Sequence, residues 1–379
     1  MRADVVVVGL GGMGSAAAAA LSRRGRRVVG LERHWPAHDR GSSHGQSRII
    51  RQAYFEHPSY VPLLLEAYER WERLERDADA DLLTETGGLV VGPPDSQAVA
   101  GALASAREHD LPHELLEARE VAARWPAMTP AEGEVALHEP RAGFVRPEAT
   151  VSAHLRLAVA AGAELRFGTL VRSWRATESG VTVHTSAGAV EADRLVLCGG
   201  SWSGDLLTGL DVPLTVERQL QVWLTPRDGA APFAPDRQPV WIWEDASGEQ
   251  AYGFPALPGD AGVKAAFFRR GGPADPDTVD RAVQPGEVEA LAAFLSGRIP
   301  ALAAPAVRAA ACLYTLTPDH HFAIGVHPGH PSVTVAAGFS GHGFKFVPVI
   351  GELLADLAID GATARPIELF DLRRFARLR

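Results

Sequence analysis

A glycine-rich turn near the start of the chain has the residue types and spacing that bind a dinucleotide. The turn GLGGMG, with Gly9, Gly11 and Gly14, follows the apolar run Val5 to Val8 and precedes a helix-forming stretch and a second apolar run that ends at Glu32. In this order the glycines let the backbone approach a pyrophosphate, and the carboxylate accepts a hydrogen bond from a ribose hydroxyl. The sequence therefore predicts a dinucleotide site and disfavours the 2′-phosphate of NADP.

Lysine is almost absent from the chain. Only Lys264 and Lys345 are lysines among 37 basic residues, and the others are arginines. A surface position tolerates either residue, whereas a compact ammonium can do what a planar guanidinium cannot. The two lysines are therefore candidate functional residues, with chance survival as the alternative.

The two cysteines, Cys198 and Cys312, are too few for a disulfide framework or a CxxC zinc site. Cys198 ends the apolar run RLVLC and is interpreted as a buried apolar thiol. Cys312 is expected in a polar turn, where it is either a thiol available for chemistry or a buried apolar thiol. His320 and His321 beside Asp319 are better explained by a turn than by a metal site, so no metal is predicted.

Composition narrows the function class. The chain has 379 residues, 46% apolar and 22% charged, which indicates two or three globular domains. The net charge is −9 without long runs of one sign, so the sequence lacks the clustered positive charge that binds nucleic acid. No stretch has the length or pattern of a membrane span or a signal peptide. We expect a cytoplasmic small-molecule enzyme with no membrane partner.

Periodicity predicts an α/β fold with a second domain of α+β type. Helices are expected at about 61–76, 148–162 and 346–359, strands at 181–185, 188–191 and 194–198, and loops at 226–239 and 271–286. The dinucleotide domain is expected from the discontinuous segments 1–80, 147–214 and 313–379. Segments 81–146 and 215–312 are expected to form the second domain.

Four segments carry a family resemblance: GLGGMG, GSSHGQSRIIR from Gly41, CLYTLTPDHHFAIG from Cys312, and GFSGHGFKF from Gly338. Together they resemble the monomeric sarcosine oxidase and N-methyltryptophan oxidase family, flavoenzymes of the glycine oxidase and D-amino acid oxidase group. The resemblance extends from Val5 to about Glu352. It implies a Rossmann-like FAD-binding domain and a mixed-sheet substrate domain.

The resemblance also implies how FAD is held. Cys312 matches the cysteine that forms a thioether with the flavin 8α carbon, and a thiolate beside a cation can add to that electrophilic methyl group. His44 and Arg48 match residues beside the flavin ring that support its attachment and potential. The expected cofactor contacts are Gly9, Gly11, Gly14, Glu32, Ser43, Arg48, Trp202, Cys312, Gly341, Gly343 and Lys345.

The substrate residues follow from the same resemblance. Arg51 and Lys345 match the pair that holds the substrate carboxylate, and two cations there would also favour the neutral form of a bound amine. Tyr252 matches a tyrosine that lines the pocket. Lys264 matches the lysine that promotes the reaction of reduced flavin with oxygen, because a positive charge stabilises developing superoxide.

One position departs from the family pattern. Where the relatives have an active-site histidine four residues beyond the oxygen-site lysine, this chain has Phe268. With Trp241 and Trp243 nearby in sequence, an aromatic wall favours a bulkier or cyclic secondary amine over sarcosine. The expected substrate pocket is Arg51, Trp243, Tyr252, Phe268 and Lys345.

The resemblance thus implies a monomeric FAD-dependent amine oxidase. It would convert a small secondary amino acid, N-methyl or cyclic, into an imine and reduce oxygen to hydrogen peroxide. One alternative is a flavin dehydrogenase that passes electrons to a quinone or a carrier protein. A second is a non-catalytic nucleotide-binding module.

Overall fold

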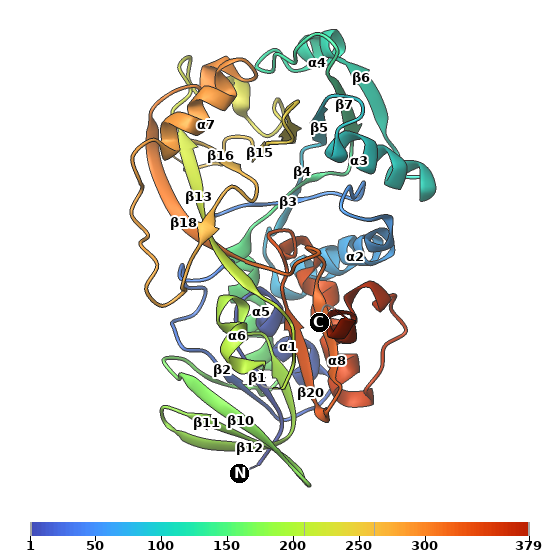
Figure 1. The fold of residues 1–379 in the computed structure, drawn as a ribbon, viewed down its shortest axis with the longest axis vertical. Helices are drawn as coiled ribbons and strands as arrows, with labels where there is room; N and C mark the ends of the chain where they lie inside the picture. Colours follow the sequence, from blue (N-terminus) through green and yellow to red (C-terminus); the bar gives the residue numbers. More distant parts are fainter. Residues whose placement is uncertain (1, 208, 261, 378–379) are drawn as a thin grey trace.

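The computed structural model describes residues 2–207, 209–260 and 262–377. Its first large sheet occupies the lower half of Figure 1 and has a parallel core in the order β20-β12-β1-β2-β9, extended by antiparallel β10, β11 and β19. The strands are β1 (Ala3–Val8), β2 (Val28–Leu31), β9 (Glu164–Arg166), β10 (Val171–Thr177), β11 (Gly180–Thr185), β12 (Gly188–Leu197), β19 (Ala323–His327) and β20 (His330–Ala337).

A second, mixed sheet occupies the upper half of Figure 1. Its strands are β5 (Gly88–Gly92), β6 (Glu114–Glu117), β7 (Val135–Glu139), β13 (Thr215–Leu224), β14 (Val240–Glu244), β15 (Gln250–Gly253), β16 (Val263–Phe267), β17 (Gly272–Pro273) and β18 (Ala306–Leu316). A small third sheet joins β3 (Arg48–Ile50), β8 (Gly143–Val145) and β4 (Leu83–Glu85).

The helices divide between the two sheets. Those of the dinucleotide part are α1 (Gly12–Arg23), α2 (Val61–Ala78), α5 (Pro147–Ala160), α6 (Ser203–Leu206) and α8 (Val347–Asp360), and those beside the second sheet are α3 (Gln97–Glu108), α4 (Ala118–Arg124) and α7 (Glu287–Ser296). Among the described residues, no helix combines the length and apolar character needed to cross a bilayer.

Small side chains allow the central helices to pack tightly. The run Ala16 to Leu21 of α1 is buried, and α1 contacts both α5 and α8. A Cβ on Gly351 of α8 would lie 2.7 Å from Ala16. The valines of β1 are buried because helices and loops cover both faces of a parallel sheet. This packing fixes the start of α1 beside the end of β1, where the dinucleotide site begins.

The α/β class predicted from sequence is confirmed, while several boundaries differ. The runs expected at 188–191 and 194–198 form the single strand β12. Cys312 lies inside β18 and not in a turn, because residues 306–316 pair with β13 along their whole length. Strand β18 also crosses the domain boundary expected at 312/313. The two-domain division stays a prediction.

Candidate active site

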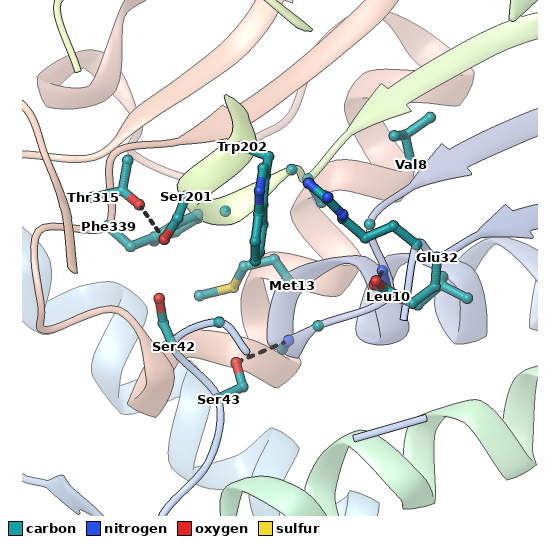
Figure 2. Close-up of a pocket in the computed structure, with 18 of the residues that line it drawn as sticks. Val8, Leu10, Met13, Glu32, Ser42, Ser43, Ser201, Trp202, Thr315 and Phe339 are labelled. Carbon is teal, nitrogen blue, oxygen red and sulfur yellow. Dashed lines mark hydrogen bonds between the residues drawn. The ribbon is translucent and has the colours of Figure 1, made fainter. Parts of the chain in front are cut away.

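A cavity of about 460 Å³ lies at the carboxyl end of the first sheet and is lined by the glycine turn, by the ends of β2 and β12, and by residues 338–341 and 343–344. Figure 2 shows Met13, Glu32, Ser43, Trp202 and Thr315 arranged around this space from separate segments. Of the expected cofactor residues, the lining includes Gly9, Gly11, Glu32, Ser43, Arg48, Trp202, Gly341 and Gly343, and omits Gly14, Cys312 and Lys345.

Two glycines shape the turn at the start of α1. Gly9 has φ +84°, and a Cβ there would lie 2.3 Å from the Cys198 carbonyl oxygen. A Cβ on Gly14 would lie 1.7 Å from the Gly9 carbonyl oxygen. Larger residues would therefore push the turn away from the sheet, and the helix N-terminus would no longer face the cavity. That N-terminus is a site for an anion such as pyrophosphate.

Glu32 is fixed by backbone donors at the end of β2. Its carboxylate accepts hydrogen bonds from the backbone N–H of Leu10 at 2.9 Å and of His34 at 3.0 Å, and His38 Nε2 lies 3.4 Å from Oε1. Burial raises the pKa of Glu32, but the hydrogen bond from His38 and the backbone donors outweigh it, so the net pKa is lowered. The carboxylate is ionised, and its oxygens can accept from a further donor.

Cys312 lies behind the wall of this cavity. Its Sγ is 3.6 Å from Arg48 Nη2 and 3.8 Å from the carbonyl oxygen of Ser42, and both of these residues line the cavity. A guanidinium therefore lies within contact distance of this sulfur. Cys198 differs, because burial alone raises its pKa to about 12. Cys198 itself lines the cavity, and of the two thiols Cys312 is the one with a guanidinium at 3.6 Å.

A smaller inner pocket of about 60 Å³ adjoins the first cavity, and Arg48, Tyr314, Gly341 and Phe344 line both. The structure brings four of the five expected substrate-pocket residues to its wall: Arg51, Tyr252, Phe268 and Lys345. The sequence analysis missed Glu56, Ile242, Tyr314 and His342, which also line it. Tyr314 was detectable in principle, because it is two residues from Cys312 and a strand places alternate side chains on one face.

Trp243 is the expected pocket residue that the structure places elsewhere. Alternate residues of β14 point to opposite faces, so Ile242 reaches the pocket while Trp241 and Trp243 belong to the core of the second sheet. Trp243 Nε1 donates a hydrogen bond to Glu134 Oε1 at 3.0 Å. The expectation that Trp243 lines the substrate pocket is therefore wrong.

Three cations, Arg48, Arg51 and Lys345, and one carboxylate, Glu56, line the inner pocket. Arg51 is 4% exposed, and its Nη2 lies 2.6 Å from Glu56 Oε2 while Nη1 donates to the Ala53 carbonyl oxygen at 2.6 Å. Lys345 Nζ donates to the His342 carbonyl oxygen at 2.9 Å. Burial raises the pKa of Glu56, but neighbouring cations, Arg51 first, bring it down to about 2. Glu56 thus partly neutralises the cations that a ligand carboxylate would meet.

Lys345 gives this site a pH dependence. Burial, followed by the charge of Arg51, lowers the pKa of Lys345 to about 7. A simple carboxylate such as propionate should therefore bind less tightly as pH rises through 7, by up to about tenfold per pH unit. Titration of the dissociation constant between pH 6 and pH 9 measures this effect.

The same titration on two variants separates Lys345 from other groups. The guanidinium of Lys345→Arg stays charged over this range, so its affinity for propionate should be flat. His342 has its pKa lowered to about 3 by burial, so it does not titrate there. A slope that persists in Lys345→Met would assign the pH dependence to another residue.

Lys264 is buried against the loop that contains His44. The buried Lys264 Nζ donates to the carbonyl oxygens of Gly45 at 2.7 Å and Ser47 at 2.8 Å, and neither Lys264 nor His44 lines the two cavities. Burial and then the charge of Arg48 lower the pKa of Lys264 well below its ordinary value. The same two causes lower the pKa of His44 to about 3, so its imidazole is neutral.

The acidic and histidine residues at 319–321 form a turn. The backbone N–H of His321 donates to Asp319 Oδ1 at 3.1 Å, and Thr317 Oγ1 donates to the His321 carbonyl oxygen at 2.7 Å. Within the part of the chain that the structure describes, no group of three or more histidine, cysteine or acidic side chains could hold a metal ion.

Comparisons with known proteins agree on one family. A family model described as FAD dependent oxidoreductase matches residues 4–357. The chain is 56% identical to a monomeric sarcosine oxidase of Streptomyces avermitilis, over 98% of both chains. It is 33% identical to an N-methyl-L-tryptophan oxidase of Salmonella dublin, over 100% of both. The structure of NikD, described as an unusual amino acid oxidase, matches with a TM-score of 0.86 at 28% identity, covering 98% of this chain and 97% of that one.

Proposed function

This chain belongs to the FAD-dependent oxidoreductases, in the group of the monomeric sarcosine and N-methyltryptophan oxidases, and we propose that it oxidises secondary amino acids at the inner pocket. The activity is that of an FAD-dependent amine oxidase. The observation that carries the substrate class is the pair of buried cations, Arg51 and Lys345, in a pocket that shares four wall residues with the dinucleotide cavity.

The larger cavity fits FAD. Gly9 and Gly14 allow the close backbone turn, the N-terminus of α1 faces a pyrophosphate, and the ionised Glu32 accepts from a ribose hydroxyl. When bound, FAD accepts a hydride equivalent from the substrate and passes the electrons to an acceptor. The chain must supply position, charge and exclusion of water.

Arg51 and Lys345 would hold the substrate carboxylate. Arg51 offers two parallel N–H donors and Lys345 a point charge. Because Nη2 of Arg51 already donates to Glu56 and Nη1 to the Ala53 carbonyl oxygen, a bound carboxylate must replace or share those contacts. The cations disfavour a further positive charge, so they lower the pKa of the substrate amine and favour the neutral form that is oxidised.

The proposal also covers the attachment of the flavin, its reaction with oxygen and the oligomeric state. Cys312, beside Arg48, would attach the flavin covalently, and Lys264 would promote the reaction with oxygen that yields hydrogen peroxide. We also propose a monomer, as in the Streptomyces avermitilis relative described by that word. The alternative is a dehydrogenase that passes electrons to a quinone or a carrier protein. Rapid oxidation of the reduced enzyme by air would favour the oxidase over this dehydrogenase.

A panel of N-methyl and cyclic amino acids, assayed anaerobically for flavin bleaching and aerobically for peroxide, tests the function. We expect bleaching by several secondary amino acids and peroxide in equal amount to the amine consumed. Bleaching without peroxide would favour the dehydrogenase. The absence of bleaching by every secondary amine would favour a nucleotide-binding module without catalysis.

Phe268 should set the preference among these substrates. Its ring packs edge-to-face on Tyr314, with the ring centroids 6.1 Å apart, at the wall of the inner pocket. Apolar contact contributes about 25 cal/mol per Å² removed from water, and sarcosine offers almost no such area. We expect kcat/KM for a larger N-methyl or a cyclic amino acid to exceed that for sarcosine by at least about tenfold, roughly 1.4 kcal/mol.

Steady-state assays of the wild type and of Phe268→His check this preference. The histidine variant removes apolar surface and restores a polar contact, so it should narrow the gap. If the wild type prefers sarcosine, Phe268 does not select the substrate and only the oxidase part of the proposal remains.

A further inference from the structure

A third cavity, of about 610 Å³, lies beside the inner pocket and shares the wall residues Phe55, Glu56 and Phe268 with it. Its other wall residues are Gln97, 247–250, 269–270 and 319–321. The inner pocket has about one tenth of this volume. The side chain of a larger amino acid would therefore extend past Phe268 into this outer cavity, which we call the vestibule.

The carboxylates of the vestibule wall already have arginine partners. The ion pairs are Glu56–Arg51 at 2.6 Å, Glu249–Arg270 at 3.0 Å and Asp319–Arg374 at 2.7 Å. Arg269 makes no ion pair with a carboxylate of the described residues. Its Nε and Nη2 both donate to the Ser340 carbonyl oxygen, at 3.2 Å and 3.0 Å. Arg269 is thus a cation of this wall without a paired carboxylate, and Glu56 and Glu217 act on its charge only from beyond ion-pair distance.

Arg269 is also held in a costly conformation. Its φ is +57°, and Ser340, which accepts its hydrogen bonds, and His320, across the vestibule wall, have φ of +49° and +59°. Non-glycine residues rarely adopt such angles, and they persist where the surroundings enforce them. The guanidinium lies 4.4 Å from the centroid of the Phe268 ring. This arrangement fixes a cation directly beside the residue that separates the pocket from the vestibule.

Among the titratable groups of the wall, Glu56 favours the charge of Arg269 without forming an ion pair with it. Burial is the first cause that lowers the pKa values of His320 and His321, so both rings are neutral near pH 7. His320 Nδ1 is buried and has no hydrogen-bond partner among the described residues. Burial likewise disfavours the charge of Arg269, whose pKa is lowered. An anion bound here would receive a guanidinium donor and could use the imidazole as a second one.

We propose that Arg269 is a specificity-determining residue that binds a second carboxylate, carried at the end of the substrate side chain. The inference rests on the proposed oxidation of secondary amino acids and names the class within it. Arg51 and Lys345 hold the α-carboxylate, the aliphatic stem packs on Phe268, and the distal carboxylate reaches Arg269 in the vestibule. The substrate class is an N-alkyl amino acid with an acidic side chain.

Three N-methyl amino acids of one configuration test the assignment: N-methylglutamate, its neutral isostere N-methylglutamine, and N-methylalanine. The second-order rate constant for anaerobic flavin reduction is measured for each in the holoenzyme. We expect the wild type to favour N-methylglutamate over N-methylglutamine by about tenfold. Arg269→Gln should abolish that ratio while the rate with N-methylalanine stays within about twofold.

Two further variants exclude a general loss of charge or of folding. Arg270→Gln removes the neighbouring arginine, which is paired with Glu249, and should keep the preference. Arg269→Lys should keep part of it. An equal preference in the wild type and Arg269→Gln, or a wild-type preference for N-methylglutamine, would overturn the role of Arg269 and leave the proposed function standing. Reduction by none of the three would overturn both.

Discussion

Replacing Lys264 with methionine is expected to slow the reaction of the reduced enzyme with oxygen by about 10³-fold, roughly 4 kcal/mol of transition-state stabilisation. The ammonium lies among the carbonyl oxygens of Gly45 and Ser47 and the rings of Phe254 and Trp223, whose centroids are 4.8 Å and 5.4 Å away. A charge so poorly solvated acts strongly on developing negative charge on oxygen. Anaerobic reduction by substrate should change much less, because that half-reaction forms no such charge.

Stopped-flow measurement of the two half-reactions separates an oxygen role from a structural one. Methionine leaves the carbonyl oxygens of Gly45 and Ser47 without this donor, so the thermal midpoint and cofactor content are measured beside the rates. Lys264→Arg restores the charge and should recover part of the oxygen reaction. Equal losses in both half-reactions would assign Lys264 to substrate binding or folding.

The lowered pKa of Lys264 predicts how the rate of the oxygen reaction changes with pH. A lysine is charged below its pKa, and burial places that pKa well below the ordinary value. The wild-type oxygen reaction should therefore slow as pH rises, beginning at a lower pH than a solvated lysine would allow. Lys264→Arg should lose this decline, because its guanidinium stays charged.

The dinucleotide half of the site was predictable because its determinants are local. The turn from Gly9, the helix after it and the acidic end of β2 occur within one short segment, and the backbone approach that excludes a Cβ at Gly14 is encoded in that spacing. The family resemblance then extended the prediction to Arg51, Tyr252, Phe268 and Lys345, which do gather at one pocket.

The rest of the site depends on which face of a strand each residue occupies and on pairing between strands that are far apart in sequence. Trp243 was placed at the pocket from its proximity in sequence, yet a shift of one residue along β14 sends it to the opposite face, and Ile242 takes the position. Glu56 is five residues from Arg51, but nothing in that spacing requires the ion pair. The sequence analysis expects Cys312 in a turn because polar residues follow it at 315–321, whereas pairing with the distant β13 makes it part of a strand.

Replacement of Cys312 is expected to have an all-or-none effect on the covalent attachment of FAD. Denaturing mass spectrometry of the wild type should give the mass of the protein plus one FAD, and Cys312→Ser should give the apoprotein mass. Strand β18 carries Cys312 and Tyr314 on one face, and Tyr314 lines both cavities, so the thiol lies close behind the cofactor wall. Serine keeps the size but lacks the nucleophilic thiolate.

Arg48 provides a second, graded test of the same attachment. Its Nη2 lies 3.6 Å from Cys312 Sγ, and removal of that cation in Arg48→Met should slow covalent incorporation of added FAD, followed as acid-stable flavin absorbance over time. Cys198→Ser is the matched control, because burial keeps that thiol protonated with a pKa of about 12, and it should incorporate FAD as the wild type does. Release of intact FAD from the wild type by acid precipitation would contradict the attachment, since a thioether survives acid while a non-covalent complex does not.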